Sequence, residues 1–173
     1  MFKNTIFRRM TALVLTLALA AAAALPGLAV YPMPIQTASE TEAVYLFNAD
    51  TGKTILNQNA DQQQYVASLT KLMTALLLLE SGKDLNGEVT VPTALTQEFR
   101  DIQNANGTTM GLRIGETVRR IDLLNAMLIV SANDAASVIA YDVGGSVLDF
   151  VKQMNARAQE LGCTGTNFTC AHG

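Results

Sequence analysis

The sequence predicts a mixed α/β fold of the α+β type, in which strands come early in the chain and helices follow. Three observations support this class. Residues 42–58 have the pattern of a β-hairpin, the segments after residue 69 are apolar at helical spacing, and no internal repeat interrupts this order. With 173 residues, the chain has the length of one domain, or of one domain behind a processed leader.

The first 29 residues are predicted to be a secretory signal peptide. A short cationic stretch ends at Arg9, residues 10–25 are almost wholly apolar, and small residues precede a cut after Ala29. An uncleaved membrane anchor is the alternative, because residues 10–30 are long enough to span a bilayer, although a Pro-Gly pair interrupts them. Either way, we expect the working part of the protein to lie outside the cytoplasm.

Residues 30–41 are predicted to be a tether, since they hold two prolines and no periodic pattern. The hairpin follows: residues 42–47 are apolar and β-prone, residues 48–52 have turn chemistry, and residues 53–58 return as a second strand. An isolated hairpin is marginally stable in water and leaves open edges. We therefore expect this sheet to need partners that the chain does not supply.

Helices are predicted from residue 69 onward. Residues 69–79 are nearly all apolar and are expected to form a helix buried on all sides, which ends at Ser81-Gly82. Residues 88–92 are expected to form a short extended piece. Residues 93–111 are polar and are expected to be irregular and partly helical.

The last third of the chain is predicted to hold three helices. Thr117 is expected to cap the first, which runs to about residue 130 with Ile121, Leu124 and Leu128 on its buried side.

The other two helices are set off by breaks. Residues 131–133 separate the first helix from the second, over residues 134–141, and two glycines end the second. The third covers residues 146–161, opens with a capping box-like Ser146 and is closed by Gly162.

Charge and histidine content exclude several functions. Without the three cations of the leader, 9 basic residues face 15 acidic ones, a balance of −6, so no nucleic-acid partner is expected. The single histidine, His172, excludes a multi-histidine metal site and argues against a Ser-His-Asp triad. In an oxidising compartment Cys163 and Cys170 would form a structural disulfide or remain two free thiols.

The first motif with chemical meaning is Ser-x-x-Lys, formed by Ser68 and Lys71 at the start of the apolar helix. Because positions three apart share a helical face, the Lys71 amine can reach the Ser68 hydroxyl and act as the base that a serine nucleophile needs. Burial and the positive end of the helix dipole both disfavour the ammonium form. The Ser68 N–H is placed to stabilise an oxyanion. A four-residue motif of this kind is weak evidence alone.

The second motif is Ser131-Ala132-Asn133, at the break between two apolar helices. A hydroxyl and an amide at such a break can point into a cleft, relay a proton and hold a substrate amide. A plain helix boundary uses the same residue types, because Ser and Asn favour caps.

Together the two motifs match the first two of the three that mark penicillin-binding proteins and class A β-lactamases. Longer stretches extend the likeness. Residues 66–80 (VASLTKLMTALLLLE), 115–136 (GETVRRIDLLNAMLIVSANDAA) and 150–162 (FVKQMNARAQELG) closely resemble low-molecular-mass D-alanyl-D-alanine carboxypeptidases, serine peptidase family S11. The resemblance runs from about Ala43 to the last residue.

This resemblance implies the penicillin-recognising fold of DD-peptidases and β-lactamases, an antiparallel sheet flanked by helices, over residues 42–173. It implies that Ser68 is the acylated nucleophile, Lys71 its general base and Ser131 a proton relay, and that Asn133 holds the substrate. The implied reaction releases D-alanine from a peptidoglycan stem peptide ending in D-Ala-D-Ala, through an acyl-enzyme that water hydrolyses, in cell-wall biogenesis and remodelling. The implied place is the bacterial periplasm or cell-wall space. β-Lactams would acylate the same serine, and no metal or organic cofactor is implied.

The third family motif, Lys-Thr-Gly, is absent; Gly52-Lys53-Thr54 has the letters in the wrong order and lies in the predicted hairpin. In the family, that strand supplies a cation for the substrate carboxylate and a second oxyanion donor, whose loss costs about 10²–10³ in rate. We therefore expect an incomplete catalytic domain, its C-terminal strands missing, with little or no activity alone. A naturally shortened protein is the alternative. Membrane association is expected only through an uncleaved leader or the missing C-terminal part.

Two other functions are weighed against this one. A serine β-lactamase is disfavoured, because the only glutamate after Asn133 is Glu160, in a predicted helix and without the E-x-x-L-N pattern of class A enzymes. A non-catalytic envelope protein that binds stem peptides or β-lactams through a relic site is not distinguished by the sequence.

Overall fold

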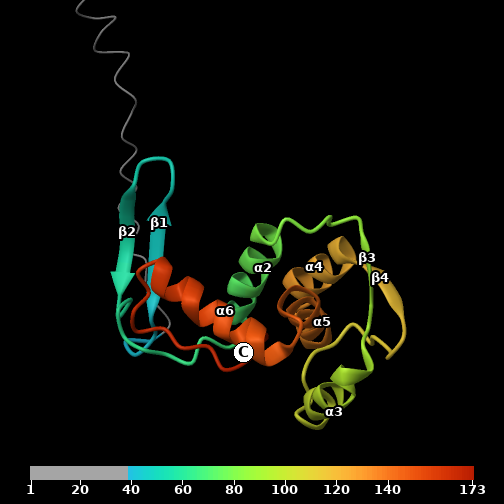
Figure 1. Cartoon of the computed structure of the whole chain (residues 1–173). Coiled ribbons are helices and arrows are strands. Elements are labelled where there is room, and N and C mark those ends of the chain that lie inside the picture. Colours follow the sequence, from blue (N-terminus) through green and yellow to red (C-terminus); the bar gives the residue numbers. More distant parts are fainter. Residues whose placement is uncertain (1–38) are drawn as a thin grey trace, which may run out of the picture. The chain divides into compact units, whose positions relative to one another are not determined.

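The computed structural model describes residues 39–173. The predicted signal peptide, residues 1–29, and most of the predicted tether, residues 30–41, therefore lie outside the described residues. The chain divides into two compact units, one that ends at Asn59 and one from Ala60 to Gly173. Their elements are labelled in Figure 1.

The first unit is a β-hairpin, which confirms the sequence prediction. Strand β1 (Val44–Asn48) pairs antiparallel with β2 (Lys53–Gln58). The turn between them uses the expected chemistry, because Asn48 Oδ1 accepts the Thr51 N–H at 2.9 Å and Gly52 adopts a left-handed φ of 67°.

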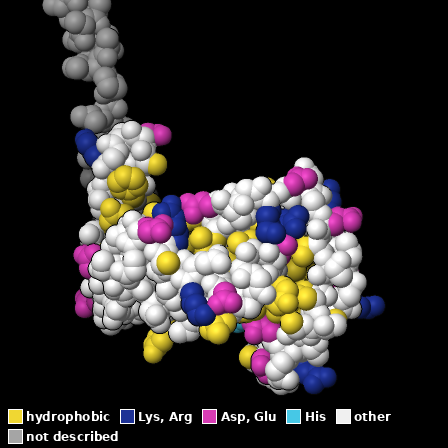
Figure 2. All heavy atoms as spheres, in the orientation of Figure 1, with side chains coloured by type: hydrophobic (Ala, Val, Ile, Leu, Met, Phe, Trp, Pro, Cys, Tyr) yellow, Lys and Arg dark blue, Asp and Glu magenta, His cyan; other side chains and the backbone are white. Residues whose placement is uncertain are grey.

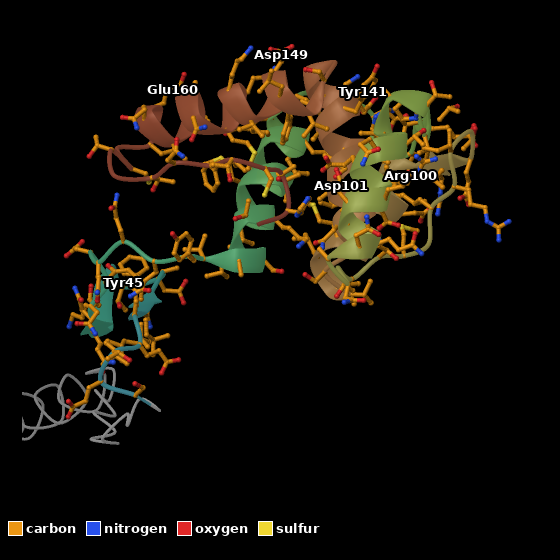
Figure 3. The ribbon with its side chains drawn as sticks, turned by 90° about the horizontal axis from the view of Figure 1, so that it is seen from below. Tyr45, Arg100, Asp101, Tyr141, Asp149 and Glu160 are labelled. Atoms are coloured by element: carbon orange, nitrogen blue, oxygen red, sulfur yellow. The ribbon has the colours of Figure 1, made fainter. Side chains whose placement is uncertain are left out.

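Within the described residues the hairpin forms a two-stranded sheet with open edges. Four of its large apolar side chains are exposed: Tyr45, Leu46, Phe47 and Ile55. The rings of Tyr45, labelled in Figure 3, and Phe47 stack with centroids 6.3 Å apart. This is the partnerless sheet that the sequence predicts.

The second unit is built around helix α5 (Asn133–Gly144), whose side chains from Asp134 to Ala140 are all buried. Helices α2 (Thr70–Glu80), α4 (Arg120–Ile129) and α6 (Val147–Glu160) pack against it (Figure 1). The largest fully buried side chains at these contacts are Phe150, Leu78, Leu123, Met127, Ile139 and Met154.

A smaller layer completes this unit. A 3₁₀ turn, η2 (Thr93–Leu95), leads into helix α3 (Thr96–Asn104), and strand β3 (Glu88–Thr90) pairs antiparallel with β4 (Thr117–Arg119). Another 3₁₀ turn, η1 (Ala67–Leu69), precedes α2. Among residues 39–173, no helix combines the length and the apolar character needed to cross a bilayer.

The prediction that Thr117 caps a helix is wrong. Thr117 belongs to β4, where its hydroxyl lies 3.0 Å from that of Thr90, and the helix begins at Arg120. The cause is pairing with a strand that lies far away in the sequence, which helical periodicity does not register. Leu128, expected on the buried side, is 48% exposed.

The prediction that the first helix is buried all round is also wrong. Leu72 is 62% exposed and Leu79 is 56% exposed, whereas Thr74 is fully buried. Polar residues point inward because the C-terminal segment offers them backbone acceptors: Thr74 Oγ1 donates to the Ala171 carbonyl at 2.7 Å. Apolar side chains therefore reach the surface, as they do on the face shown in Figure 2.

The ends of the last two helices confirm the sequence analysis. Gly145 terminates α5 in the left-handed conformation, with a φ of 75°. Ser146 Oγ then accepts the Asp149 N–H at 3.0 Å, and the Asp149 carboxylate accepts from Ser146 Oγ at 2.9 Å. Asp149 lies on the outer side of α6 in Figure 3.

Candidate active site

The start of α2 positions the first two candidate residues. Turn η1 places Ser68 at the surface, and one helical turn later Lys71 is only 2% exposed. Lys71 Nζ donates a hydrogen bond of 3.2 Å to Ser68 Oγ. Ala67, beside the serine, has a left-handed φ of 45°, a strained state that costs a non-glycine residue about 1–3 kcal/mol. The Ser-x-x-Lys spacing thus brings base and hydroxyl together as predicted.

Lys71 is held in place by a second acceptor. Its Nζ also donates to the backbone carbonyl of His172 at 2.9 Å. Burial lowers the pKa of Lys71 below its ordinary value of 10.5, and the negative charge of the nearby Cys170 thiolate opposes that change. A buried amine with a lowered pKa loses its proton more readily, which is what a general base requires.

Ser131 approaches the same hydroxyl from another helix. It lies in the connection between α4 and α5, has a left-handed φ of 61°, and donates to Ser68 Oγ at 2.9 Å. Two donors, Lys71 and Ser131, therefore converge on one oxygen. Strained backbone at both Ala67 and Ser131 fits a functional site, where such strain is commonly retained.

These three residues border a cavity of about 440 Å³. The other lining residues are apolar: Val66, Leu69, Leu72, Met127 and Leu128. An apolar hollow with a few convergent polar groups is the usual character of a small-molecule site.

Asn133 is placed differently from the other three. It opens α5, its N–H donates to the Thr108 carbonyl at 2.8 Å, and its side-chain nitrogen lies against Gly107. Among the described residues it does not line the cavity beside Ser68. The structure therefore brings together Ser68, Lys71 and Ser131, and puts Asn133 against the loop after α3.

That loop is fixed by Asp134, which the sequence analysis did not single out. Its buried carboxylate accepts the backbone N–H groups of Met110, Gly111 and Leu112, each at 3.0 Å. Asp134 follows the Ser-Ala-Asn motif directly, and a carboxylate in the first turn of a helix was the available signal. It determines the position of the loop that Asn133 touches.

The C-terminal segment is the other contribution that the sequence analysis missed. Besides the His172 carbonyl on Lys71, Gly173 packs on turn η1, where any Cβ would collide with the Ala67 carbonyl. Cys163 and Cys170 are both free thiols, one of the two alternatives left open above. No group of three or more His, Cys, Asp or Glu side chains in residues 39–173 is arranged to hold a metal ion.

The sole histidine of the chain turns its ring toward Glu98, so no imidazole serves Ser68. A serine hydroxyl between a buried lysine and a second serine, on helices combined with antiparallel strands, is the arrangement expected of the class that contains penicillin-binding DD-peptidases and class A β-lactamases.

The sequence model of the D-alanyl-D-alanine carboxypeptidase family, peptidase family S11, matches residues 32–173. The chain belongs to this family, and the resemblance stated from the motifs is confirmed.

Individual relatives agree. The chain is 33% identical over 136 residues to D-alanyl-D-alanine carboxypeptidase DacF of Bacillus subtilis, covering 77% of this chain and 33% of the relative. It is 36% identical over 145 residues to D-alanyl-D-alanine carboxypeptidase DacA of Haemophilus influenzae, covering 81% and 35%. The chain thus spans about a third of the length of these curated relatives.

Solved structures show the same fold. The Streptomyces K15 DD-transpeptidase aligns with a TM-score of 0.67 at 30% identity, covering 75% of this chain and 51% of that one. Penicillin-binding protein 5 of Haemophilus influenzae aligns with a TM-score of 0.60 at 35% identity, covering 70% and 36%. The predicted fold class is confirmed.

Proposed function

We propose that this protein acts as a serine-type D-Ala-D-Ala carboxypeptidase on peptidoglycan stem peptides, through an acyl-enzyme on Ser68. The observation that carries the proposal is the convergence of Lys71 Nζ and Ser131 Oγ on Ser68 Oγ, at 3.2 and 2.9 Å.

Acylation follows from this geometry. Neutral Lys71 takes the Ser68 proton while Oγ attacks the carbonyl carbon of the penultimate D-alanine. The Ser68 N–H stabilises the oxyanion. The Ser131 hydroxyl then relays a proton to the leaving amine as the peptide bond breaks, and free D-alanine departs.

Deacylation reverses the proton movements. Lys71 accepts a proton from water as the water oxygen attacks the ester carbonyl, the bond to Ser68 Oγ breaks, and the Lys71 ammonium returns a proton to Oγ. The family resemblance supports a role for Asn133 in holding the substrate peptide, from its position against Gly107. We place the reaction in the bacterial envelope, because the chain begins with the pattern of a secretory signal.

The missing third motif decides how the activity is measured. The 173 residues contain no Lys-Thr-Gly, the family's source of a cation for the substrate carboxylate and of a second oxyanion donor. Acylation of Ser68 is therefore a more direct readout than D-alanine release.

Glu160, labelled on α6 in Figure 3, accepts from Arg157 at 3.1 Å and is 65% exposed at its side chain, which offers no support for a β-lactamase.

The experiment is intact-mass analysis of the chain after incubation with benzylpenicillin, beside a Ser68→Ala variant. We expect an adduct of one penicillin mass on the peptide that contains Ser68, absent in the variant. A Ser81→Ala variant, which alters a serine at the opposite end of α2, is the matched control and keeps the adduct. An adduct that persists in Ser68→Ala refutes the proposal. Reversible binding without any adduct favours a non-catalytic envelope protein.

A further inference from the structure

A second cluster of reactive groups lies beside the serine site. His172 Nε2 is 3.4 Å from Glu98 Oε1, and the His172 ring is close enough to the Cys170 thiol for each group to shift the pKa of the other. Glu98 belongs to α3, the helix marked by Arg100 and Asp101 in Figure 3. A thiol, an imidazole and a carboxylate therefore lie close together, although Glu98 is far in the sequence from Cys170 and His172, which are only two residues apart.

Each member of this cluster is held by a further contact. Glu98 Oε1 accepts from Ser137 Oγ at 3.0 Å, which fixes the carboxylate from α5. Cys170 Sγ accepts the Gly173 N–H at 3.1 Å. A nucleophile next to a base that a third group orients is the general plan of an activated nucleophile.

The charges of the cluster reinforce each other. The interaction with Cys170, and then that with Glu98, raises the pKa of His172 to about 9. The interaction with the neighbouring His172 ring lowers the pKa of Cys170 to about 7. An imidazolium beside a thiol stabilises the thiolate, which is the form that reacts.

The other charged group that faces Cys170 is Lys71 of α2. The Cys170 charge acts on Lys71, and the lysine is hydrogen-bonded to the carbonyl of His172, two residues further along the chain. Cys170 is half-buried, and so a small reagent can reach it. A chemical change at the Cys170 thiol therefore affects Lys71, the proposed base of the serine site.

We propose that Cys170 is a reactive thiol and a modification site for small disulfides, through which the redox state of its surroundings controls Lys71. The Cys170 thiolate attacks one sulfur of the disulfide, a new S–S bond forms to Sγ, and the old S–S bond breaks. The other half departs as a thiolate, which takes a proton from water. Cys170 is oxidised and the departing half is reduced.

Modification would disturb the serine site by displacement. A group attached to Sγ occupies the place where the Gly173 N–H now donates, so the segment that carries the His172 carbonyl has to move. Lys71 then loses one of its two acceptors. This consequence for Ser68 rests on the proposed function, whereas the reactivity of Cys170 does not.

The test uses the full chain and bis(2-hydroxyethyl) disulfide, a neutral probe, with peptide mapping by mass at pH 5–9. Cys163 is the internal reference, because it is exposed and no described contact joins its thiol to a charged group in residues 39–173. At pH 6.5 we expect Cys170 to react at least about tenfold faster than Cys163, with a rate that rises through an apparent pKa near 7.

Two variants test whether Cys170 reacts fast because His172 and Glu98 activate its thiol or only because the thiol is exposed. His172→Gln should slow Cys170 to about the rate of Cys163, and Glu98→Gln should slow it part of the way; the melting temperature of each variant is measured to establish that it is folded. Equal rates at the two cysteines overturn the proposal, as does a Cys170 rate unchanged in both folded variants. A Cys163–Cys170 bridge in place of the mixed disulfide also overturns it.

The link to the serine site is measured separately. Chain modified at Cys170 should be acylated by penicillin at least about tenfold more slowly than reduced chain, and dithiothreitol should restore the rate. If Cys170 reacts fast but acylation is unchanged, control of Lys71 is refuted while the thiol site stands. If no chain is acylated at all, the proposed function fails instead.

Discussion

Ser131 Oγ donates a 2.9 Å hydrogen bond to Ser68 Oγ, between residues 63 positions apart in the chain. The bond joins the α4–α5 connection to the start of α2 at the atom that Lys71 also contacts. Because a hydroxyl oxygen has two lone pairs, Ser68 can accept from both donors and still keep its own proton. Ser131 is therefore positioned to pass a proton that Lys71 does not directly deliver.

Replacing Ser131 by alanine should slow penicillin acylation of Ser68 by about 10²-fold or more, the usual contribution of a positioned proton donor. Time-resolved intact mass measures the rate. Ser81→Ala is the control, since its hydroxyl caps the far end of α2 on the Leu78 carbonyl. Equal acylation rates for the two variants would show that Ser131 takes no part in the reaction.

Acylation of Ser68 should become faster as the pH rises, because only neutral Lys71 can accept the serine proton. Burial lowers the pKa of Lys71, so the midpoint of this rise is expected below 10.5. Lys71→Arg keeps the charge and removes the base, and should slow acylation by about 10³-fold. Lys83→Arg, at a partly exposed lysine paired with Asp142, is the control. A rate independent of pH would contradict the role of Lys71.

Gly107→Ala should weaken substrate binding through Asn133. A Cβ at Gly107 would come within 2.7 Å of Asn133 Nδ2 and 2.9 Å of Ile102 Cγ2, and so both side chains have to shift. We expect a lower affinity for a D-Ala-D-Ala peptide, measured by competition with penicillin. Gly165→Ala is the matched control, because its Cβ would meet only Gln63 Nε2 at 3.6 Å. An unchanged peptide affinity in Gly107→Ala would show that Asn133 does not contribute to substrate binding.

The parts of the fold that local chemistry determines were predictable from the sequence. The Asn48–Gly52 turn and the Ser146 cap each depend on residues a few positions apart, and both were predicted correctly. Strand β4 was not, because its three residues become a strand only through pairing with β3. Sequence periodicity does not contain that partner.

The same distinction applies to the site. The Ser68–Lys71 contact depends on one helical turn and was predictable from spacing. The burial of Lys71 was expected, but its second acceptor and the inward direction of Thr74 were not, because both acceptors are backbone carbonyls, of residues 172 and 171, about a hundred positions away. A carbonyl leaves no side-chain signature, and so the part that the C-terminal segment plays had to come from the structure.

The Arg120–Asp142 ion pair should support the fold more than its exposed counterpart. Arg120 donates to both Asp142 oxygens, at 2.7 and 3.0 Å, with side chains only 14% and 10% exposed. Asp142→Asn leaves a largely buried guanidinium without its counter-charge, so we expect the free energy of unfolding in urea to fall by about 2 kcal/mol. Asp122→Asn, at the exposed pair with Arg119, is the control and should change little.

The pH dependence of this effect has a definite sign. Burial alone would raise the pKa of Asp142, but the hydrogen bonds and charges of Arg120 and Lys83 outweigh it and lower the pKa below its ordinary 3.8. The stabilisation is therefore complete above about pH 5 and is lost as the pH falls through the lowered pKa. The difference between wild type and Asp142→Asn should shrink below pH 4. Urea midpoints that match those of Asp122→Asn at pH 7 would show that the buried pair contributes nothing.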